Sequence, residues 1–233
     1  MKRLTMFSFA FFCFLLLFCL SPPVQAAQQN DPFEQLFGYR AFLAGPGDFP
    51  FYFERHWTRI LQTEQDTPCL QRSASCLPLS DATHWVYLAN SAPAMDELRL
   101  LRTINAFFNK FPYASDKVTY GVVGYWPTLA EFFSRRSGDC KAYTLSKYFA
   151  LRALGVHDAQ LRIVLGYKVK GREYHSLLMV NTTKGIYILD NTTRPIDLIL
   201  PHATPPFQFI PLFMFNAKER WTFKQNLAAL LSK

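Results

Sequence analysis

Hydrophobic positions recur with a helical period in three segments in the middle of the chain. Over residues 93–111 the apolar side chains fall on one face, and Asp96 is suited to begin a helix there. Residues 128–135 predict a short helix, and residues 139–154 predict a longer one that Gly155 ends. The middle of the chain is therefore expected to be mainly helical.

After these segments the pattern changes to that of strands. Three runs rich in β-branched and aromatic residues lie at 161–169, 174–181 and 185–190. Short turns around Gly171 and Gly185 separate the runs, so we expect the strands to be antiparallel neighbours. A helix followed by a meander of strands indicates an α+β fold.

Two further segments show no clear period. Residues 28–80 are rich in Phe, Pro and Gly and predict loops, and residues 193–221 are Pro-rich and predict irregular structure. A final helix is expected over 223–233. We therefore predict a loop-rich N-terminal extension over 27–84 and one α+β domain over 85–233.

The chain begins with the features of a secretory signal peptide over residues 1–26. Two basic residues precede an apolar run, and the sequence Val-Gln-Ala fits the small-residue pattern before a cleavage point. Cleavage is expected near Ala26 or Ala27, which predicts an exported, periplasmic protein. The apolar run is close to the shortest that can span a bilayer, so an uncleaved anchor is the alternative.

The chain carries 25 Lys and Arg residues against 17 Asp and Glu residues, and its net charge is +8. The predicted signal peptide holds two of the basic residues and no acidic one, so the mature chain would carry 23 − 17 = +6. A moderate positive charge favours acidic protein partners or a membrane surface. Export and the lack of a long Lys/Arg run argue against nucleic acid as a partner.

Three cysteines remain after the signal peptide, and their spacing separates a pair from a single thiol. Cys69 and Cys76 close a short polar loop, which predicts a disulfide in an oxidising compartment. No second pair or histidine cluster accompanies them, so a zinc site is not expected. Cys140 is left as an unpaired thiol where the predicted helix over 139–154 begins.

The position of Cys140 suits a nucleophile. A helix N-terminus offers unpaired N–H groups and a partial positive charge, and both favour the reactive thiolate. A thiolate nucleophile needs a base and a group that orients the base. His175 on the second predicted strand and Asp190 at the end of the third lie near opposite one another if these strands pair. The order Cys, His, Asp is typical of papain-like chemistry.

Each of these residues also has a structural interpretation. A cysteine at a helix start is more often a core residue, and a histidine on a strand is more often structural. His157 and His202 compete for the role of base, and Asp197 competes with Asp190. His157 lies in a loop and His202 in a Pro-rich segment, so neither has strand geometry. The combination in this order favours catalysis.

Six stretches of the chain, from about Trp85 to Trp221, carry a recognisable set of motifs. They are FFNKFPY (107–113), YGVVGYWPTLAEFF (120–133), SGDCKAYTLSKYFALRALGV (137–156), HSLLMV (175–180), LDN (189–191) and FNAKERW (215–221). With them the chain resembles the bacterial transglutaminase-like cysteine peptidases, which include periplasmic LapG-type proteases that process large surface adhesins. The resemblance implies a papain/transglutaminase-like core, with the nucleophile at a helix N-terminus packed on an antiparallel sheet. It also implies a triad of Cys140, His175 and Asp190.

The chain departs from this family where its members bind calcium. The family typically reads GDCED and has Asp before the Tyr-Trp pair, whereas this chain has Lys141, Ala142 and Gly124. Calcium needs several oxygen ligands, commonly with two or more carboxylates. Asp139 alone does not supply them, so calcium is not an expected cofactor, although the resemblance implies it. A further hypothesis is that the Lys141 ammonium replaces the charge of the metal beside the thiol.

An acyl transfer also needs donors for its oxyanion. The Cys140 N–H is one candidate; Trp126 is another, because related sites use a Trp ahead of the nucleophile, although it also fits a core aromatic residue. The sequence predicts a cysteine endopeptidase that cleaves a secreted or cell-surface protein such as a large adhesin. The resemblance adds an inner-membrane regulatory receptor as partner. The alternatives are a transglutaminase or amidase with the same triad, and a catalytically inactive periplasmic binding module.

Overall fold

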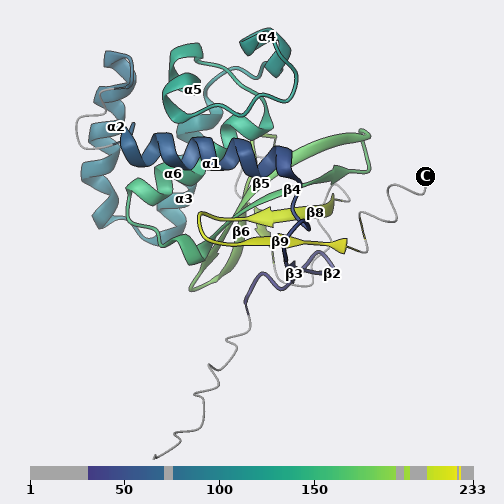
Figure 1. Ribbon diagram of the computed structural model, residues 1–233. Coiled ribbons are helices and arrows are strands. Elements are labelled where there is room, and N and C mark those ends of the chain that lie inside the picture. Colours follow the sequence, from purple (N-terminus) through teal and green to yellow (C-terminus); the bar gives the residue numbers. More distant parts are fainter. Residues whose placement is uncertain (1–30, 71–75, 193–196, 200–208, 225, 227–233) are drawn as a thin grey trace, which may run out of the picture. The chain divides into compact units, whose positions relative to one another are not determined.

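Figure 1 shows the computed structural model of the protein, which describes residues 31–70, 76–192, 197–199, 209–224 and 226. The described residues from Pro32 onward belong to one structural unit. The predicted signal peptide lies outside the described residues, as does most of the helix expected over 223–233. No helix in the described part of the chain has the length and apolar content that crossing a membrane requires.

Among the described residues, a sheet of seven strands forms the centre of the unit, and every neighbouring pair of strands is antiparallel. In order across the sheet the strands are β3 (Phe42–Leu43), β9 (Arg220–Thr222), β8 (Phe209–Phe215), β4 (Leu161–Lys168), β5 (Glu173–Thr182), β6 (Gly185–Leu189) and β7 (Asp197–Ile199). A separate hairpin pairs β1 (Gln35–Leu36) with β2 (Tyr39–Arg40). The meander of β4, β5 and β6 confirms the three predicted strands.

The sequence predicts irregular structure over 193–221, and this prediction is wrong for β7, β8 and β9. β8 contains Pro211, which has no N–H to donate, although it lies between β9 and β4. The register of β4 shifts between Leu165 and Gly166, opposite this proline, and the irregularity accommodates it. An added Cβ at Gly166 would lie 2.3 Å from the ring of Phe209, so the close approach of β8 requires glycine there.

The helices predicted from the periodic segments are present. They are α3 (Glu97–Asn109), α5 (Leu129–Arg135) and α6 (Cys140–Ala153), with short additional turns at η1 (Ala92–Ala94), α4 (Asp116–Tyr120) and η2 (Asp158–Gln160). Asp96 begins α3 by accepting a hydrogen bond from the Arg99 N–H at 2.9 Å. Thr128 and Glu131 form a capping box at the start of α5. Gly155, with a φ of 90°, follows the end of α6.

The sequence also predicts loops over 28–80, and this prediction is wrong because two helices occupy much of the segment. They are α1 (Phe51–Asp66) and α2 (Leu79–Ser91), of which α2 continues beyond it. Trp57 of α1 is fully buried, and its Nε1 donates to the Asn216 carbonyl at 3.0 Å. Its ring also meets the ring of Phe215 edge-on at 5.1 Å. Helix α1 therefore belongs to the same core as β8 rather than to a separate extension.

A disulfide lies between α1 and α2. It joins Cys69 and Cys76, as the spacing predicts, with their Cα atoms 5.3 Å apart. Cys69 is buried in the same core cluster as Trp85 and Leu88 of α2. Cys140 is the free cysteine of the described residues.

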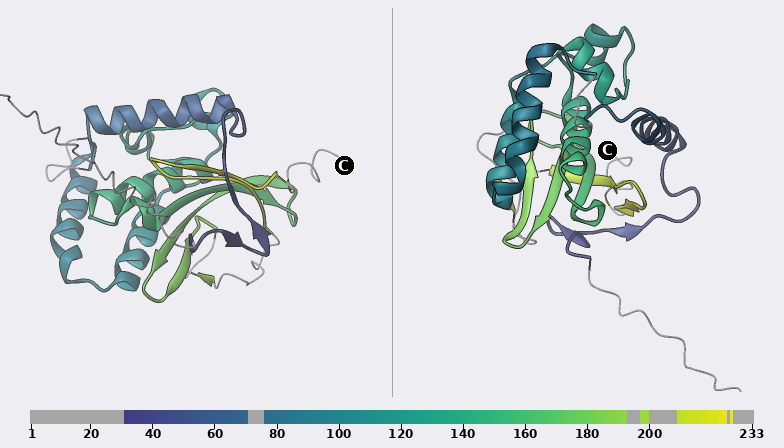
Figure 2. Two further views of the ribbon diagram at one scale, coloured as in Figure 1. Left: turned by 60° about the horizontal axis from the view of Figure 1, so that its bottom comes forward. Right: turned by 90° about the vertical axis from the view of Figure 1, so that its left-hand side faces the viewer.

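Helix α6 packs on β5, and α3 and α5 pack on α6 (Figure 2). Alternate residues of β5 belong to two cores: Leu178 and Val180 face the helices, and Leu177 and Met179 belong to the cluster that includes the β1–β2 hairpin. Successive side chains of a strand point to opposite faces, so a strand buried on both faces reads as a continuous apolar run. This packing fixes α6, and with it Cys140, relative to β5.

Candidate active site

The N-terminus of α6 presents Cys140 as its first helical residue. Asp139 caps the helix, and its Oδ1 accepts hydrogen bonds from the N–H groups of Lys141 at 3.0 Å and Ala142 at 3.2 Å. The chain turns tightly into the helix because Gly138 has no side chain: an added Cβ would lie 2.4 Å from the Cβ of Ala142. Local capping therefore fixes the position of the half-buried thiol.

The register of the strands brings His175 and Asp190 together. Leu189, the last residue of β6, lies opposite Leu178 of β5, so the next residue leaves the sheet beside the first half of β5. His175 Nε2 lies 2.8 Å from Asp190 Oδ1. The His175 side chain also lines the same cleft as Cys140 and lies close enough for the thiol to contribute to the raised pKa of the imidazole. The structure thus brings together the three residues singled out in the sequence, with a hydrogen bond between His175 and Asp190.

Asp190 is 1% exposed, and its neighbours fix the direction of its carboxylate. Its Oδ1 accepts a hydrogen bond from the Asn191 N–H at 2.6 Å, and its Oδ2 accepts one from the Thr192 hydroxyl at 2.5 Å. The Asn109 side chain of α3 donates to the Asp190 carbonyl at 2.9 Å. These bonds hold the carboxylate toward the imidazole of His175.

The same contacts set the charges of the pair. Burial alone lowers the pKa of His175, but the hydrogen bonds and charges of Asp190 and Cys140 outweigh burial and raise this pKa to about 9. Burial alone raises the pKa of Asp190, but the hydrogen bond and charge of His175 outweigh it and lower this pKa below 3.8. The pair therefore combines an ionised carboxylate with an imidazole that holds its proton near neutral pH.

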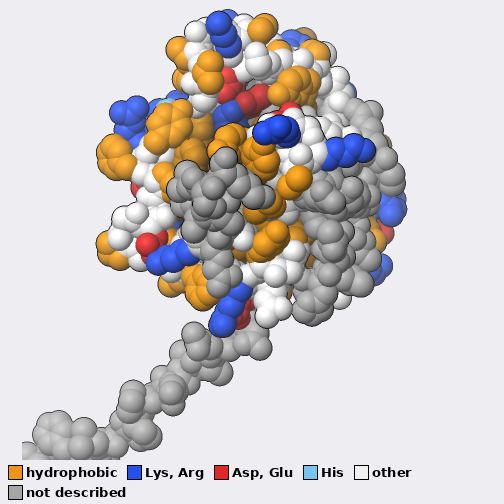
Figure 3. Space-filling view, turned by 90° about the vertical axis from the view of Figure 1, so that its right-hand side faces the viewer, with side chains coloured by type: hydrophobic (Ala, Val, Ile, Leu, Met, Phe, Trp, Pro, Cys, Tyr) orange, Lys and Arg blue, Asp and Glu red, His pale blue; other side chains and the backbone are white. Residues whose placement is uncertain are grey.

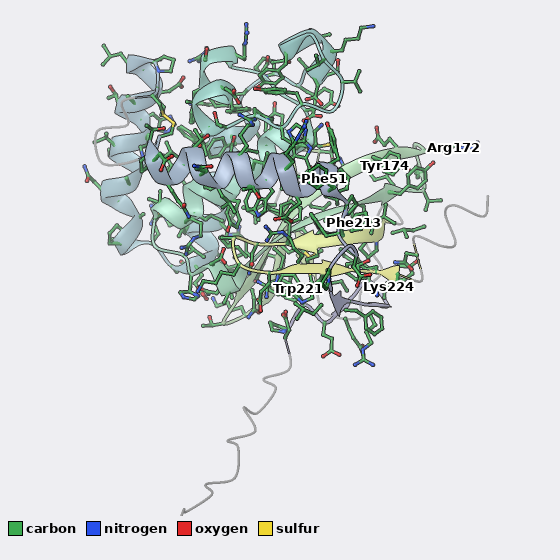
Figure 4. All side chains as sticks on the ribbon, in the orientation of Figure 1. Phe51, Arg172, Tyr174, Phe213, Trp221 and Lys224 are labelled. Carbon is green, nitrogen blue, oxygen red and sulfur yellow. A yellow bond between two sulfur atoms is a disulfide. The ribbon has the colours of Figure 1, made fainter. Side chains whose placement is uncertain are left out.

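Cys140 and His175 line a cleft of about 510 Å³. Most of the remaining lining is aromatic or aliphatic and comes from α1, the segment before α5, β4 and β8: Tyr52, Phe53, Trp126, Leu165, Leu212 and Phe213. Figure 4 shows Phe51, Tyr174 and Phe213 at the same end of the molecule, and Figure 3 shows hydrophobic side chains gathered on the corresponding face. The thiol therefore opens into a mainly apolar cleft.

Trp126 packs in the core and also lines the cleft. Its ring lies nearly parallel to that of Phe215, with centroids 5.8 Å apart, and Arg59 of α1 donates a hydrogen bond to its carbonyl. Among the described residues, no hydrogen bond engages its Nε1, which is also not one of the fully buried polar atoms without a partner. The indole N–H therefore keeps access to the cleft.

The three positions where the family resemblance implies acidic residues offer no carboxylate. The Lys141 ammonium pairs with Asp116 Oδ2 at 2.8 Å and with Asp139 Oδ2. Ala142 has no exposed surface, and Gly124 has a φ of 80°, in the region that favours glycine. Within the described residues, no group of three His, Cys, Asp or Glu side chains is placed to hold a metal ion. A calcium ion would meet an ammonium group, so the residues present do not fit it.

Sequence reasoning missed Asp116 and the contributions of Tyr52 and Phe53 to the cleft. Asp116 begins the five-residue helix α4, and no motif distinguishes it from other helix starts. Tyr52 and Phe53 belong to α1, whose segment reads as loops. Only contacts made far along the chain bring these residues to the site.

The competing candidates lie away from the cleft that holds Cys140 and His175, or outside the described residues. His157 caps η2, where its Nδ1 accepts a hydrogen bond from the Ala159 N–H at 3.3 Å. His202 and the Asp197 side chain lie outside the described residues. His175 is therefore the histidine that the structure brings to Cys140.

A family model for bacterial transglutaminase-like cysteine proteinases matches residues 67–226, more than half of the chain. The chain belongs to this family. As a bacterial transglutaminase-like cysteine proteinase it is a cysteine peptidase. The match begins well before residue 85, so the family domain includes α2 and the disulfide. No curated protein matches the sequence.

Three solved structures of Legionella pneumophila LapG are similar to this proteinase. The calcium-bound form is 24% identical and covers 75% of this chain and 98% of its own, with a TM-score of 0.54. The EGTA-treated form is 25% identical and covers 72% and 86%, with a TM-score of 0.52. A third structure is 25% identical and covers 75% and 91%, with a TM-score of 0.51. These similarities confirm the predicted α+β, transglutaminase-like fold class.

Proposed function

We propose that this proteinase is an endopeptidase in which Cys140 is the nucleophile, His175 transfers protons and Asp190 orients the imidazole. The hydrogen bond between Asp190 and His175, in a cleft that His175 and Cys140 line together, is the observation that carries this proposal. Because Asp190 engages Nε2, the nitrogen that serves Cys140 is Nδ1.

In the first half of the reaction Nδ1 of His175 holds the proton of the Cys140 thiol, and the thiolate attacks the carbonyl carbon of the scissile peptide bond. The imidazolium then gives this proton to the leaving amine, and a thioester to Cys140 remains. In the second half Nδ1 takes a proton from water, the resulting hydroxide attacks the thioester, and the Cys140 thiolate departs beside the imidazolium. The ionised Asp190 stabilises the imidazolium in both halves.

Two N–H groups support oxyanion stabilisation at this site. The Asp139 cap engages the second and third N–H groups of α6, and no hydrogen bond among the described residues engages the first, that of Cys140. The Trp126 Nε1 also keeps access to the cleft. We propose these two groups as the oxyanion donors, an arrangement in which each contributes a few kcal/mol, roughly 3, in comparable enzymes.

The lining of the cleft favours an extended, uncharged segment of a protein as substrate. Apart from His175, the charged side chains in the lining are Asp139 and Lys141, and these pair with each other. A charged substrate side chain would therefore lose its hydration without gaining a free counter-charge. We propose a secreted or cell-surface protein, such as a large adhesin, cleaved in an exposed linker.

Export to the periplasm through the predicted signal peptide is part of the same proposal. The Cys69–Cys76 disulfide supports it, because disulfides persist in oxidising compartments. The similarity to LapG is compatible with an inner-membrane receptor that regulates access to the substrate.

Calcium is a known ligand of a similar protein, since LapG of Legionella pneumophila has a calcium-bound form and an EGTA-treated form. The Lys141 ammonium lies on two carboxylates of this chain, so we propose that its peptidase activity does not require calcium. Equal cleavage rates in EGTA and in calcium chloride are expected. A rate that falls by more than about tenfold in EGTA contradicts this.

New protein N-termini in the cell envelope and medium test the proposed function, when cells with the wild-type protein are compared with cells carrying Cys140→Ala. Termini that appear only with the wild type would identify the substrate and the cleavage site. Matching profiles under several growth conditions would exclude proteolysis in those conditions. If the profiles match, a labelled amine added to the same cultures separates the alternatives: incorporation that depends on Cys140 indicates a transglutaminase, and no incorporation indicates a binding module.

A further inference from the structure

Two buried carboxylates meet at the start of the catalytic helix. Asp139 caps α6, and Asp116 is the first residue of α4; their side chains are 9% and 6% exposed. The Lys141 ammonium contacts both, at 2.8 Å from Asp116 Oδ2 and in a shorter contact with Asp139 Oδ2. In the part of the chain that the structure describes, no other basic side chain pairs with either carboxylate. Lys141 therefore supplies the positive charge that this cluster requires.

The cluster joins the middle of one wall of the cleft to α6. The wall is the segment from Tyr113 to Trp126, and both of these residues line the cleft. Apolar burial does not anchor its middle, because Val118, Val122 and Val123 are exposed. The ion pair between Asp116 and Lys141 is the contact that fastens this middle part to α6.

The ends of the wall have attachments of their own. Near its start the Ala114 N–H donates to the Gly138 carbonyl at 3.0 Å. Near its end the Tyr52 hydroxyl donates to the Gly124 carbonyl at 2.5 Å. Asp116 lies between these attachments and faces the helix that carries Cys140. Loss of the ion pair would thus release the middle of the wall while its ends stay attached.

One carboxylate oxygen of the cluster accepts no hydrogen bond from the described residues. Asp116 Oδ1 is fully buried and has no hydrogen-bond partner among the described residues, and the same is true of the Thr119 and Tyr120 hydroxyls on the same helix. The two carboxylates, joined by a third, resemble the set of oxygen ligands that calcium takes. The Lys141 ammonium is the group that excludes a metal ion from them.

We propose that Lys141 is a built-in cation that fastens the α4 wall of the cleft to the catalytic helix, and that the single substitution Lys141→Glu makes this fastening depend on calcium. Either an ammonium group or a divalent ion can neutralise two buried carboxylates, which would otherwise repel each other. Lys141 is in this sense a positioning residue. The consequence for catalysis rests on the proposed peptidase function, whereas the consequence for stability does not.

Thermal melting of the full mature protein tests the proposal, with each variant measured in EGTA, in calcium chloride and in magnesium chloride. The wild type is expected to melt at one temperature in all three. For Lys141→Glu, calcium is expected to raise Tm by roughly 5–10 °C at a hundredfold excess over its Kd. Lys117→Glu is the matched control, because Lys117 is exposed on α4, next to Asp116, and the substitution changes the net charge equally. It should show no calcium shift.

Three outcomes overturn the proposal: a calcium shift in the wild type, no calcium shift in Lys141→Glu, or an equal shift in Lys117→Glu. If Lys141→Glu does not fold, Lys141→Gln keeps the test decisive. Removal of the ammonium alone should lower Tm in EGTA, and calcium should restore part of the loss.

The alkylation rate of Cys140 by iodoacetamide adds a readout that a purely structural role would not move. In Lys141→Glu it should change on addition of calcium, and in the wild type it should not. These measurements are independent of any peptide substrate. Failure of the proposed peptidase function would leave the melting shifts intact, and failure of the cation proposal would leave cleavage by the wild type intact.

Discussion

Two clusters of buried charge lie on either side of Cys140, and they differ in the group that carries the positive charge. On one side Asp190 holds the imidazole of His175, whose pKa of about 9 lies within reach of physiological conditions. On the other side Asp116 and Asp139 hold the ammonium of Lys141. Burial alone lowers the pKa of Lys141, but the two carboxylates outweigh burial and raise it above 10.5.

The difference corresponds to two tasks at the start of α6, which are proton transfer and the holding of a fixed geometry. A group that can lose its proton suits transfer of protons, because both of its states are populated during the reaction. A group that stays charged suits holding a fixed geometry. We therefore expect the His175 cluster to serve proton transfer and the Lys141 cluster to hold the position of the cleft wall. Variants of the first should mainly lose activity, and variants of the second should mainly lose stability.

The largest expected effect follows removal of the proton-transferring group. His175→Gln should lower kcat/KM for a cleaved peptide by at least about a thousandfold, because the thiol loses its base. At pH 9.5, where most of the wild-type imidazole has lost its proton, the Tm of the variant should differ from that of the wild type by only a few degrees, roughly 3 °C or less. A variant that keeps more than a tenth of the wild-type rate would show that His175 is not the base.

The next effect follows loss of the orienting carboxylate. Asp190→Asn should lower kcat by about a hundredfold to ten-thousandfold, because the amide neither fixes the ring nor stabilises its charge. The substitution also removes contributions that raise the pKa of His175. The alkaline limb of the pH–rate profile, expected near pH 9 in the wild type, should therefore move to lower pH. A limb that stays in place would mean that another group titrates there.

The raised pKa of His175 also makes stability depend on pH. Its pKa is 6.5 without these contacts and about 9 in the folded protein, so folding favours the protonated form. This contribution is present in full below about pH 6.5 and is lost as the pH rises through about 9. Tm should fall between pH 6.5 and pH 9.5 by more in the wild type than in His175→Gln, which serves as the control.

A smaller loss of stability is expected on the other side of the comparison. Lys141→Gln leaves two buried carboxylates without a cation, and its side chain is 18% exposed in the wild type. We expect a loss of about 2 kcal/mol, or roughly 5 °C in Tm. The pH of the alkaline limb should stay within about 0.3 units, because the triad remains. A shifted limb would show that the two clusters are not separate.

The variant with the smallest expected effect is a control for a general loss of stability. Asp96→Ala removes the cap of α3, which lies in neither cluster, and should cost about 1 kcal/mol. Its effect on kcat/KM and on the calcium response should be negligible. A large loss of activity here would mean that any loss of stability lowers the rate, and the comparison of the clusters would then need rates measured at matched fractions of folded protein.

Patterns along the chain were sufficient for the parts of the site that depend on near neighbours. The apolar period and the Asp139 cap predict α6, and the pairing of β5 with β6 predicts the approach of His175 to Asp190. These features need only a helix start and a short hairpin, both of which have local signals. The three residues of the proposed triad could therefore be singled out without the structure.

Features that depend on distant contacts were not predictable in this way. Helix α1 follows a segment rich in Pro and Gly, and its Trp57 is buried against β8, more than 150 positions along the chain, where it donates to Asn216. Strand β8 carries Pro211, which normally argues against a central strand. The role of Asp116 is apparent only from its ion pair with Lys141. No local pattern encodes such pairings.

The two sides of the cleft come from opposite ends of the described chain. Tyr52 and Phe53 belong to α1, Leu212 and Phe213 belong to β8, and Cys140 lies between them in sequence. Synthesis proceeds from the N-terminus, so the thiol emerges from the ribosome long before the strand that completes the cleft. A nascent or truncated chain would carry the nucleophile without a place to bind a substrate. The order of biosynthesis itself would then protect the cell from its own protease until the last strand has paired.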